Sequence, residues 1–185
     1  MTAHFELQPE ETELQMLAEQ YWQQACNRER QMEIEAFEAG ASIRNGEYTL
    51  SNLESIVRWK SERLVHYLIG NGSLRIRRAL EVAANPESST KAAMMALLEL
   101  RGVDVPMASS ILATIFPERY IELDYEDLEA LGQVRQDVRF YEEYLAFCRA
   151  IADKGIVQPQ GQLPGPTPLH ALDRALAQWA RNRSV

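Results

Sequence analysis

The sequence is poor in residues that cross-link a chain or bind a metal. Its 185 residues include two cysteines and three histidines. Cys26 and Cys148 are too few for a disulfide framework and stand too far apart for a structural zinc site. His4, His66 and His170 have no metal-ligand spacing. We therefore expect free thiols in a reducing compartment, and neither a metal nor a cofactor.

Targeting signals and long apolar runs are also missing. The first residues, MTAHFELQPEETE, are acidic and lack the basic start and apolar stretch of a signal peptide. The most apolar run, residues 105–116, contains two serines and a threonine. It is shorter than the roughly 20 residues that span a bilayer. These features predict a cytoplasmic protein that does not act at a membrane. No Gly-rich phosphate loop, nucleophile elbow or catalytic triad pattern is present.

The charge is negative overall but uneven along the chain. The net charge of −8 argues against broad affinity for nucleic acids, because such binding rests on neutralising phosphates. Residues 58–101, however, hold 8 Lys and Arg against 4 Asp and Glu, a local net charge of +4. The basic middle is either one anion-binding face or a chance fluctuation on a solvated surface.

The apolar residues recur at helical spacing along nearly the whole chain, and no alternating pattern indicates a sheet. With 46% apolar residues, the chain can bury an ordinary core. We predict an all-α fold, a helical bundle, with helices over about residues 9–37, 49–68, 73–82, 88–100, 106–116, 126–131, 138–152 and 169–181.

Turn signals suggest four parts. Gly40 and the Asn45-Gly46 pair predict a turn that closes an acidic N-terminal helical appendage, residues 1–46. The main helical domain would span residues 47–154. Residues 155–168, rich in Gly, Pro and Gln, predict a linker without a helix. Residues 169–185 would form a C-terminal helix packed on the domain through its leucines.

Residues 97–112 predict two helices joined by a four-residue turn. Gly102 can adopt the left-handed conformation that ends a helix, and Val103 would fill the core between the two helices. Ala108 is small where the helices approach closely. The second helix would present free backbone N–H groups to a phosphate, and the hydroxyls of Ser109 and Ser110 would add donors. Such a motif grips a DNA backbone without recognising its sequence.

This segment resembles the helix-hairpin-helix of the DNA glycosylase superfamily, the endonuclease III and 8-oxoguanine glycosylase group. That family's motif is roughly Leu-Pro-Gly-Val-Gly-x-x-x-Ala, with a catalytic Asp about 22 residues after its first Gly. Here Asp124 lies 22 residues after Gly102, in an apolar-apolar-Asp context. The chain also resembles bacterial proteins that join such a unit to a Trp-Lys-x-x-Arg segment, here residues 59–63, and to a Leu-Asp-Arg-Ala-Leu helix, here residues 172–176.

The resemblance implies a DNA-glycosylase-like fold, double-stranded DNA as partner and a catalytic Asp124. In the family this Asp helps a flipped nucleotide lose its base. The DNA-binding residues that we assign from the motif and the nearby basic positions are Gly102, Val103, Val105, Ser109, Ser110, Lys60, Arg63 and Arg101.

Two residues of the motif depart from the family pattern. The second glycine is replaced by Asp104, whose carboxylate would repel a phosphate. Pro106 stands where bifunctional members carry a nucleophilic Lys, which excludes Schiff-base chemistry at this position. The iron–sulfur cysteine cluster of endonuclease III has no counterpart.

Several candidates have two interpretations. Lys60 and Arg63 either line a nucleic-acid groove or pair with neighbouring acids, and Trp59 either stacks a base or packs in the core. Arg75, Arg77 and Arg78 fall on more than one helix face and suggest a solvated surface. Asp124 either acts in catalysis or caps the helix that follows it, and both roles can coexist.

Two hypotheses follow. The first is a DNA-binding protein of DNA-glycosylase-like fold with monofunctional base excision through Asp124. The second is a catalytically inactive module of the same fold that binds a protein partner through its acidic N-terminal helices. The first requires Asp124 at the mouth of a cleft that Lys60 or Arg63 also lines.

Overall fold

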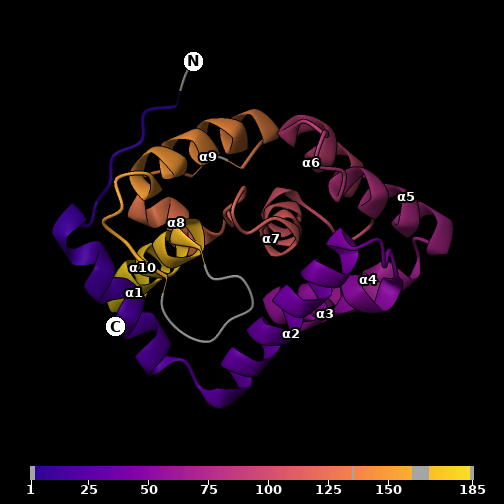
Figure 1. The fold of residues 1–185 in the computed structure, drawn as a ribbon, viewed down its shortest axis with the longest axis horizontal. Coiled ribbons are helices and arrows are strands. Elements are labelled where there is room, and N and C mark those ends of the chain that lie inside the picture. Colours follow the sequence, from indigo (N-terminus) through magenta and orange to yellow (C-terminus); the bar gives the residue numbers. More distant parts are fainter. Residues whose placement is uncertain (1–2, 135, 160–166, 184–185) are drawn as a thin grey trace.

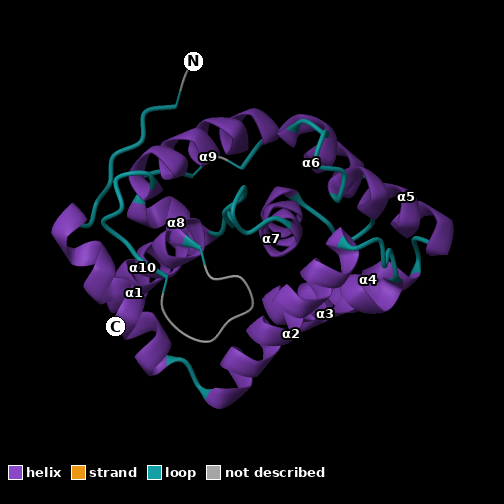
Figure 2. Cartoon of the chain, in the orientation of Figure 1, coloured by secondary structure: helices purple, strands orange, loops and turns teal. Residues whose placement is uncertain are grey.

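The computed structural model describes residues 3–134, 136–159 and 167–183, and these residues form helices and loops without a strand (Figure 2). The predicted all-α class is therefore confirmed for them. Two short 3-10 helices, η1 (Glu11–Glu13) and η2 (Glu62–Leu64), accompany ten α-helices. The α-helices are α1 (Leu14–Gln24), α2 (Asn27–Arg44), α3 (Leu50–Lys60), α4 (Val65–Ile69), α5 (Ser73–Ala83), α6 (Thr90–Leu98), α7 (Val105–Ile115), α8 (Tyr125–Ala130), α9 (Val138–Ala152) and α10 (Pro168–Arg183).

Helix α7 forms the centre of the molecule, and the other helices surround it (Figure 1). Every residue from Met107 to Ile115 is buried. The segment tolerates burial on all sides because its polar side chains are small hydroxyls that bond within the protein. Thr114 Oγ1, for example, donates to the carbonyl of Ile111 at 2.8 Å. A helix that is apolar all round belongs in the core.

Gly40 lies inside α2, so the turn predicted there is wrong. It allows α2 to approach α7, because a Cβ atom at Gly40 would lie 2.3 Å from the backbone oxygen of Thr114. The other turn signal is confirmed: α2 ends at Arg44, and Gly46 follows with a φ of +98°. Glycine thus serves close packing at one position and a left-handed turn at the other.

The N-terminal helices are part of the core and do not stand apart as the predicted appendage. Helix α1 packs along α10, and α2 packs against α3 and α7. Leu14, Leu17, Ala36 and Ile43 are buried in the same hydrophobic cluster as α7. Apart from the buried Glu33, the acidic side chains of this region are exposed or half-buried. Helices α1 and α10 lie side by side, although they stand near opposite ends of the chain (Figure 1).

The helix predicted over residues 49–68 is divided. Helix α3 ends at Lys60 because Ser61 adopts an extended backbone, with φ −160° and ψ 101°. The chain then turns through η2 into α4, which packs beside the α6–α7 turn: a Cβ atom on Gly102 would lie 2.9 Å from that of Tyr67. Lys60 and Arg63, three residues apart, therefore belong to different elements.

The predicted C-terminal helix is confirmed as α10, but more of it is buried than its leucines indicate. Asp173, Arg174 and Gln178 are buried along with the apolar face. Of the predicted linker, residues 155–159 and 167 form no helix and residue 168 begins α10, whereas residues 160–166 lie outside the described part of the chain.

Candidate functional site

The α6–α7 turn has the local geometry that its sequence predicts. Gly102 has a φ of +85°, and Val103 is buried. Asp104 caps α7, because its Oδ1 accepts the N–H of Met107 at 2.9 Å. A carboxylate of the chain itself thus occupies the helix N-terminus, where the motif would hold a phosphate. Val105 is half-buried at the first position of α7.

Ser109 and Ser110 lie inside the protein, not on the outer surface of the turn where we expected DNA-binding donors. Both are essentially without exposed surface. Ser109 Oγ donates to the carbonyl of Pro106 at 2.6 Å and accepts the N–H of Leu123 at 2.8 Å. Ser110 Oγ lies 3.2 Å from a carboxylate oxygen of Glu122. These hydroxyls therefore anchor the segment that precedes Asp124.

Residues 120–124 form an extended segment that is held along its length. The hydroxyl of Tyr141 donates to the carbonyl of Ile121 at 2.9 Å, and that of Tyr144 donates to the carbonyl of Glu122 at 2.7 Å. Both tyrosines come from α9 and are fully buried. The positions of Glu122 and Asp124 are thus fixed by buried side chains of α7 and α9.

Asp124 is at once a helix cap and a partly exposed carboxylate. Its Oδ1 accepts the N–H groups of Glu126 and Asp127 at 3.1 and 3.2 Å, and its side chain is 26% exposed. Its Oδ2 lies 3.2 Å from Nζ of Lys60. Burial opposes ionisation, but Lys60 and the backbone N–H of Asp127 outweigh it and lower the pKa of Asp124. The carboxylate is therefore ionised at neutral pH.

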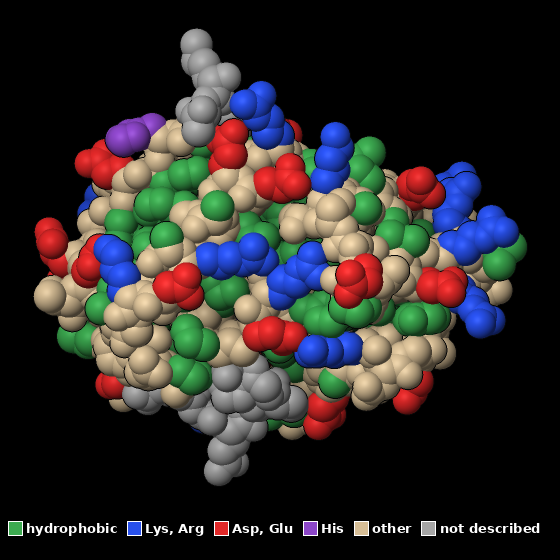
Figure 3. Space-filling view, turned by 45° about the horizontal axis from the view of Figure 1, so that its top comes forward, with side chains coloured by type: hydrophobic (Ala, Val, Ile, Leu, Met, Phe, Trp, Pro, Cys, Tyr) green, Lys and Arg blue, Asp and Glu red, His purple; other side chains and the backbone are tan. Residues whose placement is uncertain are grey.

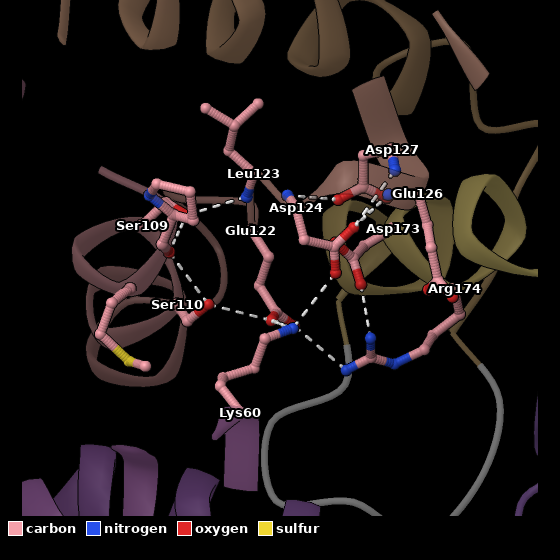
Figure 4. A network of polar contacts seen from close by, with 12 residues as sticks. Lys60, Ser109, Ser110, Glu122, Leu123, Asp124, Glu126, Asp127, Asp173 and Arg174 are labelled. Atoms are coloured by element: carbon pink, nitrogen blue, oxygen red, sulfur yellow. Dashed lines mark hydrogen bonds and ion pairs between the residues drawn. The ribbon is translucent and has the colours of Figure 1, made fainter. Parts of the chain in front are cut away.

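Lys60 bridges two carboxylates at the end of α3. Its Nζ lies 2.6 Å from Glu122 and 3.2 Å from Asp124 (Figure 4). Although burial disfavours its charge, these carboxylates raise the pKa of Lys60 well above the usual range. The ammonium group stays protonated and has no free electron pair for attack on carbon. Lys60 thus holds Asp124 in place as a charged hydrogen-bond donor.

Arg174 is the centre of a buried ionic network. Its Nη1 lies 2.6 Å from Asp173 and its Nη2 3.2 Å from Glu122 (Figure 4). Its Nε lies 2.9 Å from Glu33. His170 Nε2 lies 2.8 Å from the same oxygen of Glu33. Burial opposes the charge of Glu33, but Arg174 and His170 lower its pKa to about 2. The network joins α2, α10 and the segment before α8.

Two further carboxyls have an oxygen without a hydrogen-bond partner among the described residues: Oδ1 of Asp127 and Oδ1 of Asp173. Burial and neighbouring acids raise the pKa of both groups well above the usual range. The site therefore combines ionised carboxylates, Glu33 and Asp124, with carboxyls whose ionisation is suppressed. Environments that push the pKa values of neighbouring acids apart are typical of active sites.

A cavity of about 190 Å³ opens beside this network. Asp124 and Lys60 lie on one wall, and the aromatic rings of Tyr21 and Trp59 contribute to the others. Glu29, Met32, Glu33, Glu126, Arg174, Ala177 and Arg181 complete the lining. The cavity is smaller than the roughly 300–1,000 Å³ of pockets for drug-sized ligands. Its lining combines aromatic side chains with charged ones.

The structure brings some of the predicted site residues together and separates others. Asp124 and Lys60 share the cavity, as the first hypothesis requires. Arg63 and Arg101 are exposed and do not line it. Trp59 packs on Phe37 with ring centroids 5.8 Å apart, as the core interpretation expects, and it also lines the cavity.

Sequence reasoning missed Glu33, Glu122, Asp173 and Arg174. The burial of Arg174 could have been predicted from the alanines of α10. Alanine flanks the leucines there at positions 171, 175, 177 and 180. Small residues on several faces allow other helices to approach from several sides, which buries the polar positions between them. No comparable signal marks Glu33, since its partners lie more than 130 residues away.

The described residues contain no cluster of His, Cys, Asp and Glu arranged to hold a metal ion. None of their helices has the length and apolarity to cross a bilayer. Cys26 is exposed and Cys148 is buried, both as free thiols.

Comparison of the chain with protein-family models, with curated proteins and with solved structures returned no match.

Proposed function

We propose that the protein is a DNA-binding, monofunctional DNA-glycosylase-like hydrolase of the cytoplasm, with Asp124 as its catalytic carboxylate. One observation carries the proposal: the Asp that lies 22 residues after Gly102 is a partly exposed, ionised carboxylate in a cavity that it shares with Lys60. A mere helix cap requires neither the cavity nor the buried lysine.

The cavity suits a base that has left the DNA stack. Tyr21 and Trp59 offer aromatic faces for a heterocycle, as in other pockets for flipped bases. In the reaction, the N-glycosidic bond breaks, a water oxygen joins the sugar carbon, and the base leaves with a proton. Asp124 would stabilise the positive charge that develops on the sugar, or accept the proton of the attacking water.

The absence of a neutral amine among the described cavity residues favours hydrolysis over lyase chemistry. Lys60 is held as an ammonium by Glu122 and Asp124. A Schiff base needs an unprotonated amine. Pro106 occupies the position of the family's nucleophilic Lys. The proposal is therefore restricted to base removal that leaves an abasic site.

The test is base excision from a panel of duplexes that contain uracil, oxidised purines or alkylated purines. Asp124→Asn should reduce excision at least ~100-fold, the usual size of such a contribution, and leave affinity for a duplex with an abasic-site analogue unchanged. Asn also caps helices well, so the fold should persist. Asp137→Asn is the matched control, because Asp137 caps α9 through Phe140 and does not line the cavity.

Excision that is equal in the wild type and in Asp124→Asn would refute a catalytic Asp124. Absence of excision on every duplex, with abasic-site binding retained, would favour the alternative function: a catalytically inactive regulatory or protein-interaction module of the same fold. The observation on its side is the α6–α7 turn, where Asp104 caps the helix and the two serine hydroxyls are buried.

A further inference from the structure

Five arginines near the α4–α5 loop have no side-chain partner: Arg63, Arg75, Arg77, Arg78 and Arg101. Across residues 3–134, 136–159 and 167–183, their guanidinium groups make no ion pair, hydrogen bond or aromatic contact. Each of the other described arginines makes at least one such contact. Since the sequence has 27 acidic residues, a local group of unpaired arginines is not explained by a shortage of carboxylates.

The loop between α4 and α5 is joined to the α6–α7 turn by one side chain. Asn71 Oδ1 accepts the N–H of Arg101 at 2.7 Å, and its Nδ2 donates to the carbonyl of Arg101 at 3.1 Å. The guanidinium of Arg101 lies beside Gly70, where a Cβ atom would be 3.5 Å from Nη1. These two hydrogen bonds from Asn71 hold Arg101 next to the start of α5.

A surface groove of about 580 Å³ runs over the start of α5. Arg75 and Arg78 both line it, because residues three apart lie on the same helix face. Arg77 does not, which agrees with the expectation that the three arginines fall on more than one helix face, and all three are exposed. Glu99 is the acid among the lining residues, and α5 has no acid in its first turn. The first-turn N–H groups of α5 face no side-chain cap, which adds positive potential.

We propose that Arg75 and Arg78, which line the groove, and Arg101, which Asn71 holds beside it, form an arginine groove that binds the phosphate backbone of duplex DNA. The choice of DNA as occupant rests on the proposed function. Figure 3 shows Lys and Arg side chains gathered at the end of the molecule where α5 lies in Figure 1. Unpaired guanidinium groups recognise phosphate oxygens well, and release of counterions drives the binding.

The arginine groove also supplies what the start of α7 lacks. Asp104 occupies that helix N-terminus, and Ser109 and Ser110 are buried. Backbone contacts by α5 and Arg101 would position a duplex next to the same turn, without a phosphate at the α7 N-terminus. Contacts of this kind fix orientation and carry no sequence information.

The test compares binding of a fluorescent duplex by the wild-type chain, by the triple variant R75S/R78S/R101S, and by the charge-matched control R44S/R139S/K154S. The control removes three exposed cations that are paired to acids elsewhere on the surface. We expect the arginine-groove variant to bind at least ~10-fold more weakly near 50 mM salt. Its slope of log affinity against log salt should be smaller by about 2 to 3, since each phosphate contact contributes about 0.9. The control should keep the wild-type slope.

Equal weakening of the two variants would overturn the proposal, because binding would then follow net charge alone. Failure of the wild type to bind the duplex at low salt would overturn it too, as would preferential binding of phosphatidylserine vesicles or of RNA. The outcome is separable from that of the proposed function. If the arginine-groove variant alone loses DNA while the wild type excises no base, the groove stands and the glycosylase activity fails.

Discussion

The charges around Asp124 and the charges of the arginine groove are arranged in opposite ways. Near Asp124, Lys60 and Arg174 are withdrawn from water and share several carboxylates between them. In the arginine groove, Arg75, Arg78 and Arg101 are exposed and unpaired within the described chain. The first arrangement fixes side chains in one geometry, as chemistry on a small group requires. The second leaves positive charge available to a large external anion.

This contrast explains how an acidic protein can carry a basic face. Buried pairs satisfy their own charges and contribute little to the external field, whereas unpaired surface charges act over roughly the Debye length of about 8–10 Å. The function of each region then depends on whether its cations are already neutralised inside the protein. The following variants test that distinction, beginning with the largest expected effect.

Removal of the central cation of the buried network should be the most damaging change. Arg174→Met would leave Glu33, Asp173 and Glu122 without their shared partner, at a cost of about 3–5 kcal/mol in the free energy of unfolding. Urea denaturation at pH 7 measures this. Arg181→Met is the control, because its pair with Glu126 is 42% and 35% exposed and should be worth less than about 1 kcal/mol. If both variants lose similar amounts of unfolding free energy, buried and exposed ion pairs do not differ in their contribution to stability.

Glu33 should make stability depend on acid pH. Its folded pKa of about 2 is below the usual 4.5, so its contribution is complete above pH 4.5 and is lost as the pH falls toward 2. The shift corresponds to about 3 kcal/mol. Glu33→Gln should lower stability at pH 7 and flatten the loss between pH 4.5 and 2. Unfolding midpoints measured across that range test this, and an unchanged acid profile would contradict it.

Lys60→Met should act on both stability and the chemistry of Asp124. Glu122 and Asp124 would lose the ammonium that pairs them, which should cost about 2 kcal/mol. Burial would then dominate and raise the pKa of Asp124, so the acid limb of any excision activity should move to higher pH. A pH–rate profile that does not move would show that Lys60 supports the fold without positioning the carboxylate.

The arginine-groove variant should have the smallest effect on folding. Because R75S/R78S/R101S breaks no side-chain contact in the described structure, its free energy of unfolding should change by less than about 0.5 kcal/mol per site. Thermal unfolding in parallel with the DNA assay checks this. A large destabilisation would mean that the arginines have structural partners, and the contrast with the buried network would disappear.

Local signals in the sequence predicted the local structure well. Gly102, Gly46 and the capping residue Asp124 act as their residue types indicate, and the central helix appears where the apolar run predicts it. What failed involves contacts between distant segments. Glycine is typical of turns, but Gly40 lies inside a helix, where the missing side chain allows the close approach of α7. Ser109 and Ser110 look like surface donors until the segment before Asp124 packs against them.

Only the part of the candidate site that local motifs mark was predicted from the sequence. The spacing from Gly102 indicated Asp124, and the Trp-Lys pattern indicated Lys60. In the structure, Oδ2 of Asp124 lies 3.2 Å from Nζ of Lys60. Glu33 and Arg174 come from opposite ends of the chain, and one sequence carries no measure of how close they lie. The sequence does not distinguish Arg75 and Arg78 from Arg77. The structure does, because only the first two line the groove.

The packing of α1 against α10 has a consequence for synthesis of the protein. The cavity needs Tyr21 from α1, Glu33 from α2 and Arg174 from α10, so no nascent chain can complete it before α10 has left the ribosome. Until then Glu33 has neither its guanidinium nor its imidazole partner. The residues of the arginine groove lie between positions 71 and 101 and leave the ribosome earlier. The pocket is therefore the last of the two sites whose residues are all available for folding.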